Sequence, residues 1–220
     1  MKLPLSAARC AGHSWRLGER RRCICMEQNP AIVVLAAQTV PAPAGTAVGE
    51  QPSHVASALR DTVAHAMQTR WRVVIVTTPA WVPLVSRWVA TRDLVTLSDE
   101  ELGRGQGYAL AVGVAAHVDA AGWLMLPGDR SQVRPQTLLA VGDALKDHPI
   151  AYAQVQGRRG YPLGFAAELV SDLIALQGDD GAQRLLGRYP AWGVTVDDPG
   201  VLEGTVRGTE SAGERAAGAA

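Results

Sequence analysis

Short apolar runs alternate with amphipathic stretches along this chain from Ala31 onward. Runs of uncharged, mainly β-branched residues are typical of strands that are buried on both faces. The sequence predicts such strands at residues 31–37, 73–77, 94–97, 124–127, 150–156 and 192–196. Apolar residues that recur every three or four positions predict helices between these strands. The helices are expected to begin near Ser53, Pro79, Leu110, Pro135 and Phe165.

The order of these elements predicts the fold class. Strands separated by helical segments of about 10–15 residues form βαβ units, in which the strands are parallel and helices cover both faces of the sheet. The sequence shows no internal repeat and no sign of a second core. We therefore expect one α/β domain from about Met26 to Glu210, with three layers (α/β/α) around a mostly parallel sheet.

Both ends of the chain differ from this pattern. Residues 1–25 are rich in arginine, contain all 3 cysteines and have no sustained apolar stretch. Cys23 and Cys25 lack further ligands at the spacing of a zinc site. The segment is interpreted as a disordered basic leader, or as the product of an upstream start codon with Met26 as the true start. Residues 211–220 are expected to form a flexible tail.

Composition excludes several classes of function. The chain has 220 residues, with 21 Lys and Arg against 21 Asp and Glu, so its formal net charge is zero. A neutral chain has no overall field to attract nucleic acid or anionic lipid. No apolar run approaches the roughly 20 residues that span a bilayer. We expect a soluble, cytoplasmic protein that binds neither nucleic acid nor membrane.

The most informative candidate for chemistry is the end of the apolar run at 124–127, which stops on Gly128 and Asp129. Ligands of open α/β folds bind at the carboxyl edge of the sheet, where such a strand presents its terminal carboxylate. A carboxylate there suits Mg²⁺, which prefers oxygen ligands and often binds together with phosphates. The alternative is that Asp129 forms a turn and caps the next segment.

Several short motifs occur in a fixed order over about 180 residues. They are Leu-Ala-Ala at 35–37 followed by Gln38, Gly-Gln-Gly-Tyr-Ala-Leu at 105–110, Gly-Asp-Arg-Ser at 128–131, Gly-Arg-Arg-Gly-Tyr-Pro at 157–162, Gly-Asp-Asp-Gly-Ala at 178–182 and Asp-Asp-Pro-Gly at 197–200. In this order they resemble the landmarks of the molybdenum cofactor cytidylyltransferases, within the MobA-like nucleotidyltransferases. The resemblance implies a Rossmann-like fold of the nucleotide-diphospho-sugar transferase type.

The resemblance also implies an activity. A terminal phosphate of a molybdopterin-type cofactor would attack the α-phosphate of CTP, the favoured donor, or of GTP, and pyrophosphate would leave. The metal would be Mg²⁺, and the further partner would be a molybdoenzyme or its chaperone. The implied site residues are Asp129 as catalytic and metal-binding residue, Glu203 as second metal ligand, and Leu35, Ala36, Ala37, Gln38, Gly105, Gly107, Arg158 and Arg159 as nucleotide- or cofactor-binding residues.

Each of these assignments has a structural alternative. Gly105 and Gly107 also fit a linker into a helix, and Arg158 with Arg159 also fits a solvated hairpin tip. Asp179 and Asp198 are interpreted as capping or turn residues rather than ligands.

The chain differs from the family pattern in its first loop and in its second metal site. No basic residue occurs between Pro30 and His54, where the family has arginine and lysine for the triphosphate. The aspartate expected after residues 197–200 is absent, and Glu203 stands near its position. These differences favour a second hypothesis, a degenerate member that binds nucleotide or a partner protein without turnover. A sugar-phosphate nucleotidyltransferase is a third, weaker alternative, because it would keep the same first loop.

Overall fold

A 7-stranded sheet organises the chain in the computed structural model, which describes residues 29–37 and 53–202. The strands are β1 (Ala31–Leu35), β2 (Arg72–Thr77), β3 (Leu94–Thr96), β4 (Gly122–Pro127), β5 (Ile150–Val155), β6 (Arg158–Ala166) and β7 (Ala191–Thr195). They lie side by side in the order β3-β2-β1-β4-β6-β5-β7. Every neighbouring pair is parallel except the two that include β6. The sheet is therefore mostly parallel, as the sequence predicts.

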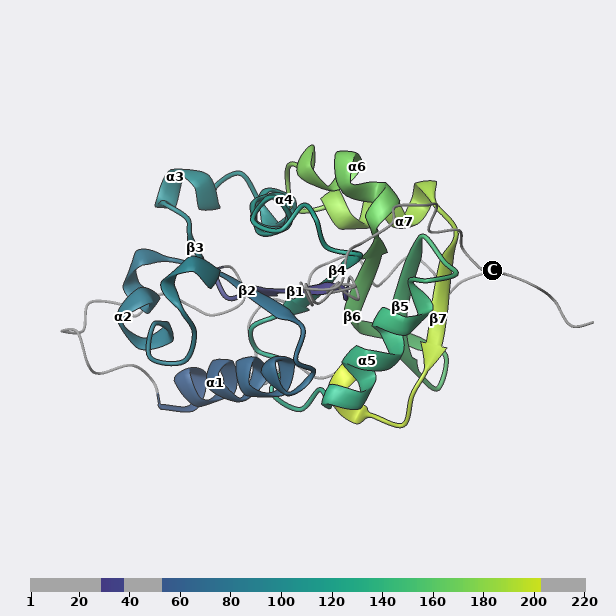
Figure 1. The fold of residues 1–220 in the computed structure, drawn as a ribbon, viewed down its shortest axis with the longest axis horizontal. Coiled ribbons are helices and arrows are strands. Elements are labelled where there is room, and N and C mark those ends of the chain that lie inside the picture. Colours follow the sequence, from purple (N-terminus) through teal and green to yellow (C-terminus); the bar gives the residue numbers. More distant parts are fainter. Residues whose placement is uncertain (1–28, 38–52, 203–220) are drawn as a thin grey trace, which may run out of the picture.

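Helices cover both faces of this sheet (Figure 1). They are α1 (Ser53–Gln68), α2 (Val82–Val85), α3 (Asp99–Leu102), α4 (Gln106–Ala115), α5 (Pro135–Ala144), α6 (Val170–Ile174) and α7 (Gly181–Arg188). Helices α4, α6 and α7 pack on one face, and α1, α2 and α5 pack on the other. The single-domain, three-layer α/β/α architecture is confirmed.

The central strand β1 shows why this sequence needs helices on both sides. Val33 and Leu35 belong to the core beneath α4, α6 and α7, whereas Ile32 and Val34 belong to the core beneath α1 and α5. All of these side chains are buried. Burial of one such side chain contributes roughly 1.5–3 kcal/mol. A continuous apolar strand gains this stabilisation only when both of its faces are covered.

The predicted helix from Phe165 to Leu176 is partly wrong. Phe165 lies in β6, the only antiparallel strand of the described sheet, and the α-helical turn in this region is α6. Strand β6 was not predicted, because its first half (Arg158–Tyr161) is polar and glycine-containing and reads as a loop. Burial begins only at its second half, where the strand passes between β4 and β5.

Other differences concern where helices begin and end. The predicted helix from Pro79 consists of a 3-10 turn at Pro79–Trp81 followed by the single turn α2. Trp81 is buried in the core, whereas Trp88 is only partly buried. Met67 and Val118 continue the apolar spacing of the helices predicted from Ser53 and Leu110, but they are 47% and 57% exposed. Two helices, α3 and α7, were not predicted as separate elements, because each is short.

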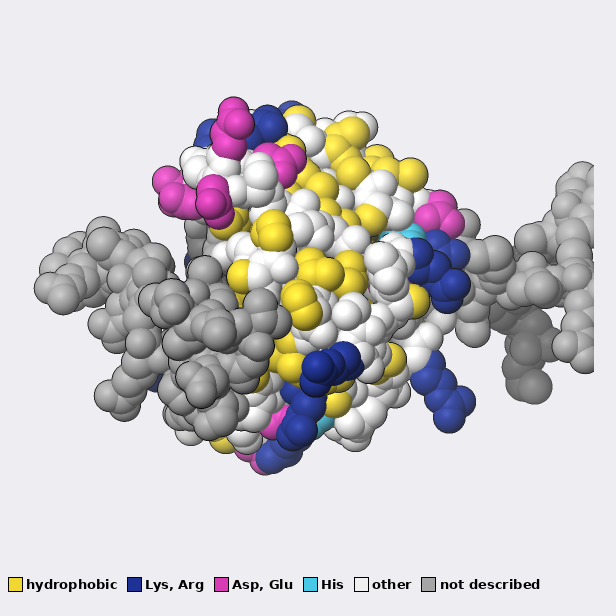
Figure 2. All heavy atoms as spheres, turned by 90° about the vertical axis from the view of Figure 1, so that its left-hand side faces the viewer, with side chains coloured by type: hydrophobic (Ala, Val, Ile, Leu, Met, Phe, Trp, Pro, Cys, Tyr) yellow, Lys and Arg dark blue, Asp and Glu magenta, His cyan; other side chains and the backbone are white. Residues whose placement is uncertain are grey.

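The end of the domain that carries α2, β3 and α3 has a mixed surface (Figure 2). Hydrophobic side chains gather in the middle of this face, and acidic side chains gather near its top. The first turn of α3 contributes three acids, Asp99, Glu100 and Glu101, which favour a helix N-terminus. The part of this face that the structure describes has no continuous basic surface of the kind that nucleic acids bind.

Some of the predictions lie outside the described residues. These are the leader at 1–25, the tail at 211–220, and two site residues, Gln38 and Glu203. Within residues 29–37 and 53–202, no helix has the length and apolar character that crossing a membrane requires.

Candidate active site

The turn after β4 places Asp129 at the carboxyl edge of the sheet, beside the end of β1. The Gly128 amide donates to the carbonyl of Leu35 at 3.0 Å. A Cβ on Gly128 would lie 3.1 Å from the Ala36 Cα, which is tighter than most real contacts. Glycine therefore lets the β4 turn approach the Leu-Ala-Ala motif of β1. The structure thus places Leu35 and Ala36 beside the turn that carries Asp129.

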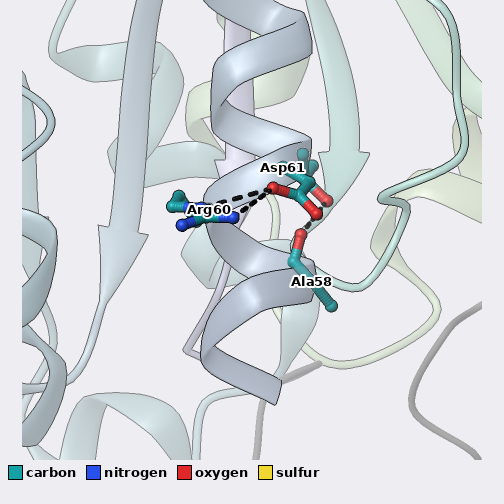
Figure 3. A network of polar contacts seen from close by, with 4 residues as sticks. Ala58, Arg60 and Asp61 are labelled. Carbon is teal, nitrogen blue, oxygen red and sulfur yellow. Dashed lines mark hydrogen bonds and ion pairs between the residues drawn. The ribbon is translucent and has the colours of Figure 1, made fainter. Parts of the chain in front are cut away.

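Helix α1 fixes the same turn from the other side. The buried hydroxyl of Thr62 donates to the carbonyl of Gly128 at 3.1 Å and to that of Ala58 at 2.9 Å. On the outer surface of this helix Arg60 points to its neighbour Asp61 (Figure 3), with a nitrogen–oxygen distance of 3.3 Å. An exposed pair of this kind contributes little stability. The contact that positions Asp129 is thus the buried one from Thr62, which the sequence analysis did not single out.

Asp129 itself is a buried carboxylate with an unsatisfied oxygen. The residue is only 8% exposed, and its Oδ1 has no hydrogen-bond partner among the described residues. Burial raises the pKa of the Asp129 carboxyl above its ordinary value, and the charge of Arg130 offsets part of this rise. Leaving such a group unsatisfied costs roughly 1–3 kcal/mol. A cost of this kind is typical of a residue retained for binding or chemistry.

The guanidinium of Arg130 lies next to this carboxylate. Its Nε is 3.6 Å from Asp129 Oδ1, which is too long for a hydrogen bond, and this nitrogen is also buried without a partner. The Arg130 guanidinium lies over the ring of Tyr161, 5.0 Å from the ring centre. The Tyr161 ring comes from β6, so β6 contributes the opposite wall of the site. Burial and the nearby Asp129 charge raise the pKa of the Tyr161 hydroxyl, which stays protonated near neutral pH.

Strand β6 begins at the same edge of the sheet and carries the two predicted arginines. Arg159 donates to Gln183 of α7 at 3.1 Å, and its guanidinium lies 5.8 Å from the centre of the Tyr152 ring. The positive charge of Arg159 opposes the rise in the pKa of the Tyr161 hydroxyl. Arg158 is exposed at the first position of the strand, opposite Val155.

The predicted glycines Gly105 and Gly107 contact a different landmark, the Gly-Asp pair at 178 and 179. The Gly107 amide donates to the Gly178 carbonyl at 2.8 Å, and the Gln106 amide donates to the Asp179 carboxylate at 3.0 Å. Asp179 thus caps the first turn of α4 from outside the helix, which agrees with its interpretation as a capping residue. These amides are already paired within the protein.

Replacing Gly105 with alanine is expected to destabilise the domain. Gly105 has a φ of 90°, and a Cβ on it would overlap the backbone of Gly178. This region of backbone conformation costs a non-glycine residue about 1–3 kcal/mol, so thermal unfolding should show a melting temperature lower by several degrees. Gly187 is a matched control, because a Cβ on it meets nothing within 4 Å and it lies in α7. Gly187→Ala should leave the melting temperature equal or higher.

The Asp-Asp-Pro-Gly landmark is also held by buried contacts. Asp198 is 2% exposed, and its carboxylate accepts from the Thr137 hydroxyl at 2.6 Å, from the Arg134 amide at 2.8 Å and from the Gly200 amide at 3.2 Å. It therefore caps α5 and the 3-10 turn at Pro199–Val201 together. A Cβ on Gly160 would overlap Val201, so this landmark packs against the start of β6.

Sequence reasoning missed further residues around the site. Arg130 and Tyr161 occur within two of the sequence motifs but were not assigned a role, although each contacts the Asp129 region. Thr77 and Thr78 end β2 at the same edge, and their buried hydroxyls have no partner among the described residues. The position of these threonines in the sequence was the available signal, because Thr77 ends the buried strand beside β1 and Thr78 directly follows it.

A metal would find few ligands in this part of the chain. Within residues 29–37 and 53–202 there is no cluster of three or more His, Cys, Asp or Glu side chains that could hold an ion. Asp129 Oδ1 is a suitable oxygen ligand because it is buried and unpaired. The second predicted ligand, Glu203, lies outside the described residues.

A hollow of about 610 Å³ lies at the opposite edge of the sheet, where β2 begins. Trp71, Trp88 and His117 contribute to its wall. It contains none of the predicted site residues, so the carboxyl edge remains the candidate active site.

Comparison with known proteins identifies the family of this chain. The model of the MobA-like NTP transferase domain matches residues 10–192. No curated protein sequence matches the chain. The structure is similar to Rv0371c of Mycobacterium tuberculosis H37Rv, with 26% identity, a TM-score of 0.62, and coverage of 76% of this chain and 88% of that one.

Two further solved structures are similar. Rv0371c in complex with manganese has 25% identity, a TM-score of 0.60 and coverage of 77% and 88%. The 4-diphosphocytidyl-2C-methyl-D-erythritol synthase of Anaerococcus prevotii has 11% identity, a TM-score of 0.59 and coverage of 82% and 92%, a likeness that concerns the fold alone. Because the family model matches most of the length of this chain, the chain belongs to the MobA-like NTP transferase domain family.

Proposed function

We propose that this chain transfers CMP, or else GMP, from a nucleoside triphosphate to a molybdopterin-type phosphate acceptor. The observation that carries the proposal is the buried, unpaired Oδ1 of Asp129 at the carboxyl edge, between the end of β1 and the start of β6. Family membership supports nucleotidyl transfer as the reaction type. The order of the sequence landmarks supports the choice of acceptor, and the product would pass to a molybdoenzyme or its chaperone.

The reaction needs positioning more than proton transfer. An oxygen of the acceptor's terminal phosphate attacks the α-phosphorus of the triphosphate, and a new phosphorus–oxygen bond forms. The bond to the β-phosphate oxygen breaks, and pyrophosphate leaves with its electron pair. Because the attacking phosphate is already anionic, no protein base has to remove a proton. The protein's part is to hold the two anions in line and to neutralise charge.

Several groups could share this task. The backbone at Leu35 and Ala36 borders the Asp129 turn, and together with Ala37 it would contact the nucleotide. Asp129 would hold the divalent cation, and Arg159 on β6 would contact phosphate or pterin. The cation would be Mg²⁺ or Mn²⁺, and Rv0371c was crystallised as a complex with manganese. When bound, such a cation neutralises phosphate oxygens.

A second candidate function is nucleotide or partner binding without turnover. The observation that favours it is the guanidinium of Arg130, whose Nε is 3.6 Å from the proposed metal ligand. A positive charge at this distance opposes a divalent cation. The first loop of the sequence also lacks basic residues that would compensate the triphosphate.

Titration calorimetry of the full chain distinguishes the two functions. CTP, GTP and ATP are each titrated with and without Mg²⁺. The transferase proposal expects Mg²⁺-dependent binding of CTP, or else of GTP, followed by release of pyrophosphate when a molybdopterin-type acceptor is added. Binding without pyrophosphate release would favour the degenerate member. Absence of binding for all three nucleotides would contradict the transferase proposal.

A further inference from the structure

Two buried polar atoms face each other in the candidate site without forming a hydrogen bond. They are Oδ1 of Asp129 and Nε of Arg130, at 3.6 Å. Their side chains are 12% and 17% exposed. Two more exposed pairs reach shorter distances, 2.8 Å for Lys146 with Asp143 and 3.0 Å for Arg188 with Asp172, although the exposed pair of Arg92 with Asp93 is 3.8 Å apart. Nearly all buried polar groups in proteins are paired, so two unpaired atoms at one place need an explanation.

The position of Arg130 is set by groups other than Asp129. The Tyr161 ring lies beneath its guanidinium, 5.0 Å from the ring centre. The Arg130 amide donates to the Pro127 carbonyl at 3.3 Å, and its own carbonyl accepts from the Val133 amide at 3.2 Å. The backbone turn and the aromatic ring therefore hold the guanidinium near Asp129 while leaving Nε able to donate to another oxygen.

The chemistry of the two atoms indicates which ligands satisfy them. A carboxylate oxygen binds a hard cation. An arginine Nε–H is a charged donor whose planar group suits phosphate oxygens. The site thus offers Asp129 Oδ1 to the metal and Arg130 Nε to the polyphosphate of a metal–polyphosphate complex. When neither ligand is bound, the opposite charges of the two side chains partly neutralise each other.

We infer that Arg130 exchanges its partner when substrate binds, moving its charge from Asp129 to an oxygen of the polyphosphate and leaving Asp129 to the metal. This inference rests on the proposed nucleotide site. It makes Arg130 a substrate-binding residue that supplies, from the β4 turn, positive charge missing from the first loop. It also means that Arg130 opposes the metal when the metal binds alone.

One substitution then has opposite effects on the two ligands. Arg130→Gln is expected to bind Mn²⁺ alone about tenfold more tightly than the unchanged chain, and to bind inorganic triphosphate in metal-free buffer about tenfold more weakly. Mn²⁺ binding is followed by the electron paramagnetic resonance signal of the free ion, and triphosphate binding by calorimetry. Arg60→Gln, on the exposed surface of α1, is the matched control and should change neither.

The opposite signs separate this role from a purely structural one. A variant that weakens both ligands, or changes neither, would overturn the inference. Arg130→Lys retains the charge but not the planar group, and it covers the case in which the glutamine variant does not fold. It should bind triphosphate more tightly than a variant without the charge, such as Arg130→Met, and equal binding by these two variants would contradict the role of the charge.

The outcome does not depend on turnover. If the chain binds Mn²⁺ and triphosphate with the expected pattern but never releases pyrophosphate, the inference holds and the transferase proposal fails. If the chain transfers nucleotide while Arg130→Gln binds both probes unchanged, the transferase proposal holds and the inference fails.

Discussion

Asp129→Asn is expected to lower the rate of metal-dependent nucleotidyl transfer by about 10²–10³-fold, the usual effect of removing one group that stabilises developing charge. The amide has nearly the shape of the carboxylate but is a poor ligand for a hard cation. Transfer is followed by pyrophosphate release with the preferred nucleotide. Asp143→Asn is the control, because Asp143 is an exposed carboxylate on α5 that pairs with Lys146. A rate unchanged by Asp129→Asn would contradict the assignment of Asp129.

The same variant should not lose stability. The pKa of Asp129 is raised in the folded protein, so its ionised form is less favourable there than in the unfolded chain. The neutral carboxyl of Asp129 contributes fully to the stability of the fold below the pKa that Asp129 has in the unfolded chain. This contribution is lost as the pH rises through the pKa that Asp129 has in the folded protein. Asp129→Asn should therefore melt at an equal or higher temperature near pH 7, and this advantage should disappear in acid. A lower melting temperature at neutral pH would show that Asp129 is needed for folding.

Asp198→Ala is expected to cause the largest loss of stability, roughly 3 kcal/mol or more, because three donors lose their acceptor. The Thr137 hydroxyl and the amides of Arg134 and Gly200 would lose their partner in a buried region. Urea unfolding at neutral pH measures the change, and the midpoint should fall without a change in slope.

The adjacent residue provides the control for this experiment. Asp197 is exposed, and its backbone carbonyl, not its side chain, accepts from Arg134. Asp197→Ala should change the free energy of unfolding by less than about 0.5 kcal/mol. If Asp198→Ala were equally neutral, the capping role of its carboxylate would be wrong.

The sequence predicted those elements of the fold that follow from the composition of a single segment. The run at 124–127 is apolar and ends in Gly-Asp, so its burial and the place of Asp129 follow from strand length and composition. The β1 run likewise predicted a central strand. The first half of β6 could not be predicted in this way, because Arg158 to Tyr161 are polar or glycine and join the sheet through pairing with β5.

In the candidate site, too, some residues could be predicted from the local sequence and others depend on tertiary contacts. The carboxylate of Asp129 was identified because its position follows from the strand before it. The roles of Arg130 and Tyr161 depend on a contact between residues 31 positions apart, a contact that local periodicity cannot show. Asp179 was recognised as a capping residue, but the helix that it caps, α4, begins 73 residues earlier in the chain. Tertiary contacts of this kind become visible only in the folded protein.

The glycine landmarks have a consequence for how such a domain can change over evolutionary time. Gly105 meets Gly178, Gly160 meets Val201, and Gly128 meets Ala36, each across a long interval of sequence. At each of these contacts the glycine has no side chain, and this allows the other segment to approach closely. Because the nearest atoms belong to the backbones of Gly178, Val201 and Ala36, a substitution of the counterpart residue makes no room. A side chain in place of any of these glycines becomes acceptable only if the two backbone segments move apart, so these positions are expected to change more slowly than their exposed neighbours.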